Sequence, residues 1–150
     1  MSEEFSNVCL SGGADGADLE WGRAAGRAGH SVIHWSYAGH RSQAAKNDII
    51  ELSAEQLVMA DDHLIRANER VKRRVPFDKP WIINLLRRSY YQVCDADAVY
   101  AVGKIKNGEV QGGTAWAVAL FCDLRPGPVY VFDQLVGEWF SLHNGNGLSR

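Results

Sequence analysis

Apolar residues along the chain fall into two patterns, short continuous runs and longer stretches with helical spacing. The short runs predict strands at residues 7–10, 31–35, 98–102, 129–132 and, as a last edge strand, 138–142. Helical spacing predicts helices at residues 15–28, 54–74, 80–94 and 114–123. Because strands and helices alternate, the pattern predicts an α/β fold with a mainly parallel sheet of about five strands.

Local signals mark where several of these helices begin and end. Ser53 and Gln56 have the spacing of a capping box, Pro76 should end the long helix, and Asp78 is placed to cap the next helix, with Pro80 in its first turn. The apolar faces expected from helical spacing are Ala17, Trp21, Ala24, Ala25 and Ala28 in the first helix, Leu57, Ala60, Leu64, Ala67 and Val71 in the second, and Ile82, Leu85, Leu86, Ser89, Tyr90 and Val93 in the third.

A glycine-rich turn follows the first strand and leads directly into the first helix. Its ligand-binding candidates are Ser11, Gly12, Gly13, Ala14 and Gly16. Glycine adopts positive φ and lets a ligand approach the backbone closely. The helix start adds unpaired N–H groups and a partial positive charge, so this turn is predicted to bind an anion. The alternative is a tight strand–helix connection that binds nothing.

A second turn of this kind comes much later in the chain and precedes the helix at 114–123. Gly112, Gly113 and Thr114 are predicted to form a second cradle, with the threonine hydroxyl bonding a phosphate oxygen. Lys104 lies upstream with Lys106, and each offers positive charge to a phosphate or is simply solvated. Ligands of parallel sheets bind beyond the carboxyl ends of the strands, so we expect both turns to serve one nucleotide-type site.

These two motifs together resemble the SLOG superfamily, which groups domains of the DprA and LOG (lonely-guy) type. The resemblance is carried by residues 11–18, read as Ser-Gly-Gly-Ala-Asp-Gly-Ala-Asp, and by Gly112-Gly113-Thr114 at a helix start. It implies a single Rossmann-like domain over residues 1–150, with a doubly wound sheet, helices on both faces, and nucleotides or their derivatives as ligands. It also implies self-association, for which helices 54–74 and 80–94 are the natural contact surfaces.

The sequence departs from that family at one place. LOG-type phosphoribohydrolases carry a glutamate shortly after the second turn, whereas Ala115, Trp116, Ala117 and Val118 follow Thr114 here. DprA-type members that bind DNA are larger and more basic. We therefore expect a nucleotide or phosphoribosyl or ADP-ribose-like ligand, with N-glycosidic hydrolysis or transfer as the candidate reaction. A non-catalytic sensor or sequestering protein is the alternative.

Three carboxylates are the candidates for such chemistry. Asp15 and Asp18 lie in the first turn, where they can bond ribose hydroxyls or orient a water, or simply stabilise the helix N-terminus. Glu109 lies three residues before Gly112 and is the nearest replacement for the absent glutamate. A carboxylate can activate water or attack the anomeric carbon in glycosidic cleavage, although an exposed loop charge explains Glu109 equally simply.

The segment at 36–47 is expected to be a long loop beside the site, because long loops in compact domains are often functional. Trp35 before it can stack on a base or pack in the core, and Arg41 can grip phosphate through its planar guanidinium. His40 can act as an acid or base near neutral pH or be ordinary surface.

Two groups of basic residues remain. Arg70, Lys72, Arg73 and Arg74 occur at a predicted helix C-terminus, where a solvated basic face suits the helix dipole. Arg87 and Arg88 follow the stripe of the next helix and either line a pocket or form a subunit contact.

Composition limits the remaining possibilities. The 150 residues carry a formal net charge of −2, which argues against a general nucleic-acid partner. Neither a signal-type run nor a membrane-length apolar stretch occurs, so no membrane partner is expected. The three cysteines suggest reduced thiols and a cytoplasmic setting. No zinc, other metal or cofactor is predicted, and residues 1–6 and 144–150 are expected to be loose tails.

Overall fold

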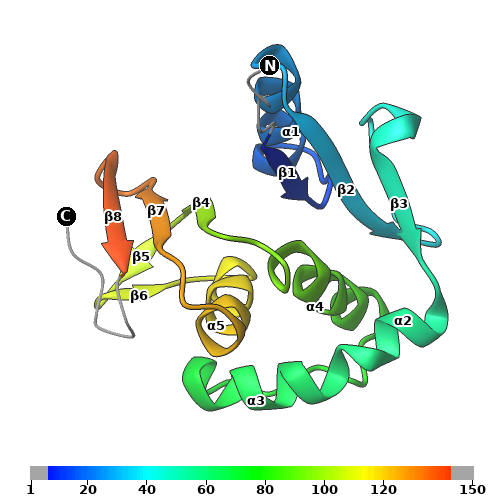
Figure 1. Cartoon of the computed structure of the whole chain (residues 1–150). Coiled ribbons are helices and arrows are strands. Elements are labelled where there is room, and N and C mark those ends of the chain that lie inside the picture. Colours follow the sequence, from blue (N-terminus) through cyan, green and yellow to red (C-terminus); the bar gives the residue numbers. More distant parts are fainter. Residues whose placement is uncertain (1–6, 143–150) are drawn as a thin grey trace. The chain divides into compact units, whose positions relative to one another are not determined.

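The computed structural model describes residues 7–142, so both expected tails, residues 1–6 and 144–150, lie outside the described residues. Contacts between residues divide the chain into two compact units with a boundary between Gln56 and Leu57. Each unit contains a three-stranded sheet and at least one long helix packed on it (Figure 1). The predicted α/β class is therefore confirmed, and each unit is described by itself below.

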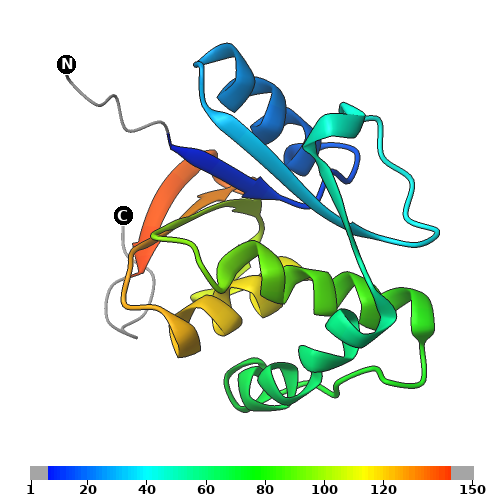
Figure 2. The ribbon, with the colours of Figure 1, turned by 45° about the vertical axis from the view of Figure 1, so that its right-hand side comes forward.

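The first unit is a parallel sheet with one helix on it. It comprises β1 (Val8–Ser11), α1 (Ala17–Arg27), β2 (Ser31–Tyr37), the 3₁₀ turn η1 (Lys46–Asp48) and β3 (Ile49–Leu52). The strand order is β1-β2-β3 and both pairings are parallel. α1 contacts β1 and β2, and Figure 2 shows the helix lying alongside β2.

The helix α1 approaches the sheet at a glycine rather than through its alanines. Leu19 and Gly22 are its buried residues, and a methyl group at Gly22 would lie only 2.4 Å from Nε2 of His34 on β2. The predicted alanine face was wrong at its two ends, because Ala17 and Ala28 are exposed. The close approach at Gly22 sets which side of the helix faces the sheet, and small side chains elsewhere on the helix do not determine it.

The predicted loop at 36–47 was too long. β2 continues to Tyr37, and Ile49–Leu52 forms a strand that pairs with it, with Trp35 opposite Ile50 and Tyr37 opposite Leu52. Four residues with one buried side chain, Leu52, give little periodicity, so this strand is recognisable only from its pairing with β2.

The second unit contains four helices and the remaining strands. Its elements are α2 (Ala54–Met59, which spans the boundary), α3 (Asp61–Val71), α4 (Pro80–Val93), β4 (Val99–Gly103), β5 (Ile105–Lys106), β6 (Glu109–Val110), α5 (Thr114–Leu124), β7 (Val129–Asp133) and β8 (Glu138–Leu142). The sheet order is β4-β7-β8, with β4 and β7 parallel and β7 and β8 antiparallel. β5 and β6 form a separate hairpin.

The core of this unit surrounds α5, which lies against β4 on one side and against α3 and α4 on the other (Figure 1). The largest fully buried side chains come from α3, α4, α5 and β7: Leu64, Ile83, Leu120, Phe121, Val129 and Val131. α5 is almost uniformly apolar, as expected for a helix covered on several sides.

The helix signals in the sequence were partly right. The capping box is confirmed, because Ser53 N–H donates to Oε1 of Gln56 at 2.9 Å and Gln56 N–H donates to Oγ of Ser53 at 3.1 Å. The predicted single helix at 54–74 is two helices that meet at Ala60, whose N–H bonds to Leu57 three residues back. It ends at Val71 and not at Pro76, because Lys72 adopts a left-handed conformation with φ 55°.

The prediction for α4 needs two corrections. Lys79 is its N-cap and no side chain caps it, so Asp78 does not have the predicted capping role; it pairs with Arg74 at 2.7 Å instead. Ile83 and Arg88 are buried, while Ile82, Leu85 and Tyr90 of the predicted face are only half-buried.

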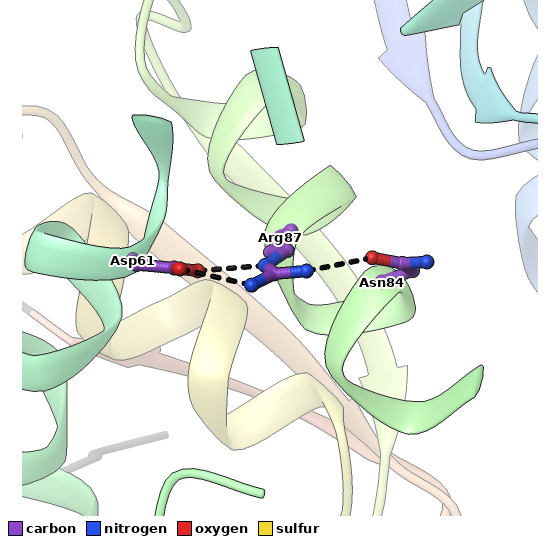
Figure 3. A network of polar contacts seen from close by, with 3 residues as sticks. All are labelled: Asp61, Asn84 and Arg87. Carbon is purple, nitrogen blue, oxygen red and sulfur yellow. Dashed lines mark hydrogen bonds and ion pairs between the residues drawn. The ribbon is translucent and has the colours of Figure 1, made fainter. Parts of the chain in front are cut away.

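Packing of α4 against α3 includes an ion pair. Arg87 donates to both carboxylate oxygens of Asp61, at 2.6 and 2.9 Å, and to Oδ1 of Asn84 at 3.1 Å (Figure 3). Arg87 therefore has a structural role that joins the start of α3 to α4.

The strand count also differs from prediction. The described residues form eight strands in three sheets, where about five had been expected, and the additional ones are β3, β5 and β6. Each has four residues or fewer. None of the helices among residues 7–142 is both long enough and apolar enough for a membrane span.

Candidate functional site

The first glycine turn lies between the carboxyl end of β1 and the N-terminus of α1, as predicted. Gly13 has φ +67° and Gly16, the N-cap of α1, has φ +97°, and L-residues with side chains rarely adopt either value. No side chain caps α1. The positive end of the helix is therefore left for solvent or for an anion.

Gly13 is packed tightly from two directions. Oγ of Ser42 donates to the carbonyl oxygen of Gly13 at 2.7 Å, and a methyl group on Gly13 would lie 2.7 Å from that Oγ and 3.2 Å from Cβ of His34. His34 is only 2 % exposed. Neither Ser42 nor His34 was predicted from the sequence as a site residue, although Ser42 belongs to the segment expected beside the site.

Asp15 and Asp18 occupy different environments. Asp15 is exposed in the turn, whereas Asp18 is half-buried in the first turn of α1, where its carbonyl oxygen accepts a bond from Oγ of Ser11 at 3.1 Å. Burial and, secondarily, the negative charge of Asp18 raise the pKa of the Cys9 thiol. The Asp18 carboxylate is thus close enough to β1 to affect the pKa of Cys9.

The second glycine turn precedes α5. Gly112 has φ +68°, and Gly113 is the N-cap in a helical conformation with no side-chain cap. The carbonyl oxygens of Gly112 and Gly113 accept the N–H groups of Ala115 and Trp116 at 3.3 and 3.1 Å. The side chain of Thr114 lies over Gly103, with Oγ1 3.7 Å from where a Gly103 Cβ would be. This contact brings the helix start to the carboxyl end of β4.

The segment before this turn forms a hairpin. Lys106 on β5 pairs with Glu109 on β6, and both are exposed, as is Lys104. The carbonyl oxygen of Lys104 accepts the N–H of Gln111 at 2.9 Å, which closes the base of the hairpin just before Gly112. The opposite charges of Lys106 and Glu109 across the hairpin explain the presence of Glu109 without catalysis. A catalytic role for Glu109 stays a prediction.

A buried carboxylate that was not predicted from the sequence supports this hairpin. Asp133 at the end of β7 is 4 % exposed, and its Oδ1 accepts the N–H groups of Ile105 at 3.2 Å and Leu135 at 2.9 Å. An aspartate directly after a buried apolar run at the carboxyl end of a parallel strand was the available signal.

The basic run at 70–74 separates into three different contacts. Arg70 pairs with Asp123 at 2.5 Å and Arg74 pairs with Asp78. Nη1 of Arg73 donates to the carbonyl oxygen of Gly112 at 2.9 Å. The four basic residues are exposed, as predicted for a solvated basic face, and Arg73 in addition reaches the second glycine turn.

The remaining predicted residues of the first unit lie on or after β2. Trp35 is half-buried within the sheet, His40 bonds Oγ of Ser36 through Nδ1 at 3.1 Å and packs against the ring of Tyr37, and Arg41 is exposed. The Ser36 contact and the Tyr37 ring explain the placement of His40 without catalysis. Base stacking by Trp35 and phosphate binding by Arg41 stay predictions.

A cavity of about 240 Å³ lies elsewhere in the second unit. It is lined mainly by Arg70, Cys122, Arg125, Gly127 and Leu142, and none of the predicted ligand residues lines it. Burial raises the pKa of the Cys122 thiol, which makes that thiol a poor nucleophile.

Each glycine turn is thus held by residues of its own unit. In the first unit, Ser42 and His34 support Gly13; in the second, Gly103, Arg73 and the hairpin support the segment at 112–114. That both turns serve one ligand stays a prediction. No protein-family model, curated protein or solved structure matches this chain.

Proposed function

We propose that this protein binds a nucleotide or a phosphoribosyl or ADP-ribose-like derivative through its two glycine-rich turns. One observation supports the proposal above all others. Each turn leads to the uncapped N-terminus of an 11-residue helix. The first turn directly follows β1, which pairs in parallel with β2, and the second follows the β5–β6 hairpin that comes after β4, which pairs in parallel with β7. Parallel strands and helix N-termini are where phosphate groups bind in α/β proteins.

The strand orders favour the same proposal. The order β1-β2-β3 begins at the strand before the first glycine turn, and the order β4-β7-β8 begins at β4, which the β5–β6 hairpin separates from the second turn. A doubly wound, Rossmann-like sheet has this kind of order on each side of its switch point. We therefore propose the finer fold class together with the function.

The candidate reaction is hydrolysis of an N-glycosidic bond, in which water adds to the anomeric carbon and the base leaves with a proton. Asp15, Asp18 and Glu109 are the proposed carboxylates. The alternative, a non-catalytic sensor or sequestering protein, is favoured by one specific observation. The first turn of α5, which begins Thr114-Ala115-Trp116, contains no acidic residue.

Binding and turnover are tested separately. Mass spectrometry of the purified protein identifies any co-purifying ligand, and calorimetry with AMP, ADP-ribose and adenosine measures affinity. A ligand at 100 times its Kd should add about 2.7 kcal/mol to stability. Absence of binding and of any thermal shift with all three compounds would overturn the proposal.

Release of free adenine from AMP distinguishes the enzyme from the sensor. Catalysis predicts that Glu109→Gln or Asp15→Asn retains AMP binding while base release is lost. Recovery of intact AMP after long incubation with wild-type protein instead favours the sensor.

A further inference from the structure

The segment after α3 is built so that Arg73 meets the second glycine turn. Lys72 adopts its left-handed conformation with its N–H bonded to the carbonyl oxygen of Asn68 at 2.8 Å. The N–H of Arg73 then bonds Oδ1 of the same Asn68 side chain at 3.0 Å. Asn68 therefore fixes the backbone from which the Arg73 side chain extends to Gly112.

The bond to Gly112 constrains a peptide plane and not only one atom. The carbonyl oxygen of Gly112 accepts both Nη1 of Arg73 and the N–H of Ala115. The bond between Gly112 and Gly113 is trans, so the N–H of Gly113 points to the opposite side from that carbonyl. Among residues 7–142, no protein acceptor takes the Gly113 N–H.

We propose that Arg73 is a positioning residue for ligand binding: it holds the Gly112–Gly113 peptide so that the Gly113 N–H faces a phosphate group. This inference rests on the proposed function and deepens it, because it assigns phosphate recognition to the second turn. The site should consequently discriminate a nucleoside monophosphate from the nucleoside that lacks the phosphate.

The neighbouring cations do not offer the same contact. Arg70 is bonded to Asp123 and Arg74 to Asp78, so their charges are partly neutralised by carboxylates. Arg73 is bonded to a neutral carbonyl and keeps its full charge beside the turn. Arginine suits this role because its planar fork has five donors, of which a single carbonyl bond uses one.

The test compares AMP with adenosine in wild type, Arg73→Ala, Arg73→Lys and Arg74→Ala. Arg74→Ala is the matched control, since it removes the same charge one residue away. Losing one positioned hydrogen bond should weaken AMP binding by about tenfold in Arg73→Ala, with adenosine affinity within about twofold of wild type. Arg73→Lys should recover part of the AMP affinity, and Arg74→Ala should bind both compounds like wild type.

Amide hydrogen exchange gives a readout that does not depend on the ligand. Exchange at residues 112–116 should be faster in Arg73→Ala than in Arg74→Ala, because the peptide plane has lost one of its two restraints. Unchanged exchange there, or an equal loss of AMP affinity in Arg73→Ala and Arg74→Ala, overturns the role of Arg73. Equal weakening of AMP and adenosine in Arg73→Ala also overturns it, because phosphate would not be the group recognised.

Failure of the proposed function gives a different result. If wild-type protein binds neither AMP nor adenosine, both the proposed function and the assignment of phosphate recognition are wrong. If wild type binds AMP and the variants at residues 73 and 74 behave alike, only the inference about Arg73 falls.

Discussion

Ser42 and Gly13 form the contact that ties the segment after β2 to the first glycine turn. The hydroxyl of Ser42 donates to the carbonyl oxygen of Gly13 at 2.7 Å and accepts the N–H of Ala44 at 3.1 Å. A methyl group on Gly13 would collide with that hydroxyl, and the φ of +67° at Gly13 is unfavourable for alanine. Both steric and conformational reasons therefore require glycine here.

Gly13→Ala should destabilise the protein by about 2 kcal/mol or more, from left-handed strain together with overpacking against Ser42. Gly113→Ala is the matched control, because Gly113 has a helical conformation and a methyl group there would meet nothing within 4 Å. It should leave stability unchanged or raise it by up to about 1 kcal/mol. Urea unfolding measures both, and equal stabilities would contradict the packing described at Gly13.

Gly113→Ala has a second use as a probe of ligand approach. The folded protein tolerates the methyl group, so a change in AMP affinity reports on the space beside the Gly113 N–H. We expect AMP binding to weaken by about tenfold or more if phosphate contacts this N–H. Calorimetry on a variant of confirmed stability provides the measurement, and wild-type affinity would place the phosphate elsewhere.

The pair of Asp61 and Arg87 should matter more for stability than the exposed pair of Asp78 and Arg74. The side chains of Arg87 and Asp61 are 17 % and 21 % exposed, and Asp61→Ala would remove both of its bonds to Arg87. We expect a loss of about 1.5–3 kcal/mol.

Asp78→Ala is the control for that measurement. The side chains of Arg74 and Asp78 are 66 % and 61 % exposed, so solvent and salt screen their attraction. Its unfolding midpoint in urea should match that of wild type. A loss as large as that of Asp61→Ala would show that burial does not separate the two pairs.

Asp133 should be needed for the conformation of the hairpin before the second turn. Asp133→Ala leaves the N–H groups of Ile105 and Leu135 without their acceptor, at a cost of about 1–3 kcal/mol. Asp133→Asn keeps an oxygen at Oδ1 and should lose less. Urea unfolding gives the stabilities, and hydrogen exchange at residues 105 and 135 should be faster in the alanine variant. Slow exchange at both residues in Asp133→Ala would argue against this role.

The thiols of Cys9, Cys94 and Cys122 should react slowly with iodoacetamide near neutral pH. Burial is the largest cause that raises the pKa of each, so the reactive thiolate is scarcer than in free cysteine. Mass spectrometry follows the alkylation rate as a function of pH. The pH at which the rate reaches half its maximum should be higher in the folded protein than in the urea-unfolded chain. A rate midpoint at or below that of the unfolded chain would exclude this environment.

The same pKa shifts make stability depend on pH. The folded state holds the thiol protons more tightly than the unfolded state does. Their contribution to stability is therefore complete below the unfolded thiol pKa and is lost as the pH rises through the folded values. The free energy of unfolding should accordingly fall with increasing pH in the alkaline range.

Sequence patterns were most reliable where the deciding interactions are local. The capping box of Ser53 and Gln56 joins residues three apart, and both of its bonds are present. Gly13, Gly16 and Gly112 all adopt positive φ beside the helices they precede, as their turns implied. Helix capping and backbone sterics act over a few residues, so composition and spacing suffice to predict them.

Expectations failed where a distant partner decides. The strand Ile49–Leu52 is defined by its pairing with β2. Likewise, Gly22 is buried because His34 of another element lies against it. Neither side-chain type nor periodicity carries this information, because the strand pairing and the burial of Gly22 both depend on which residue the folded chain places opposite.

By itself, the sequence determined the α/β class, the helices α1, α4 and α5, the longer strands and the two glycine turns, since these follow from periodicity and from the conformations that each residue allows. Only the tertiary structure decided what holds the turns. Ser42 reaches Gly13 across 29 residues and Arg73 reaches Gly112 across 39. Contacts over such separations depend on the whole path of the chain between them, because it is the packed core that brings the two partners within bonding distance.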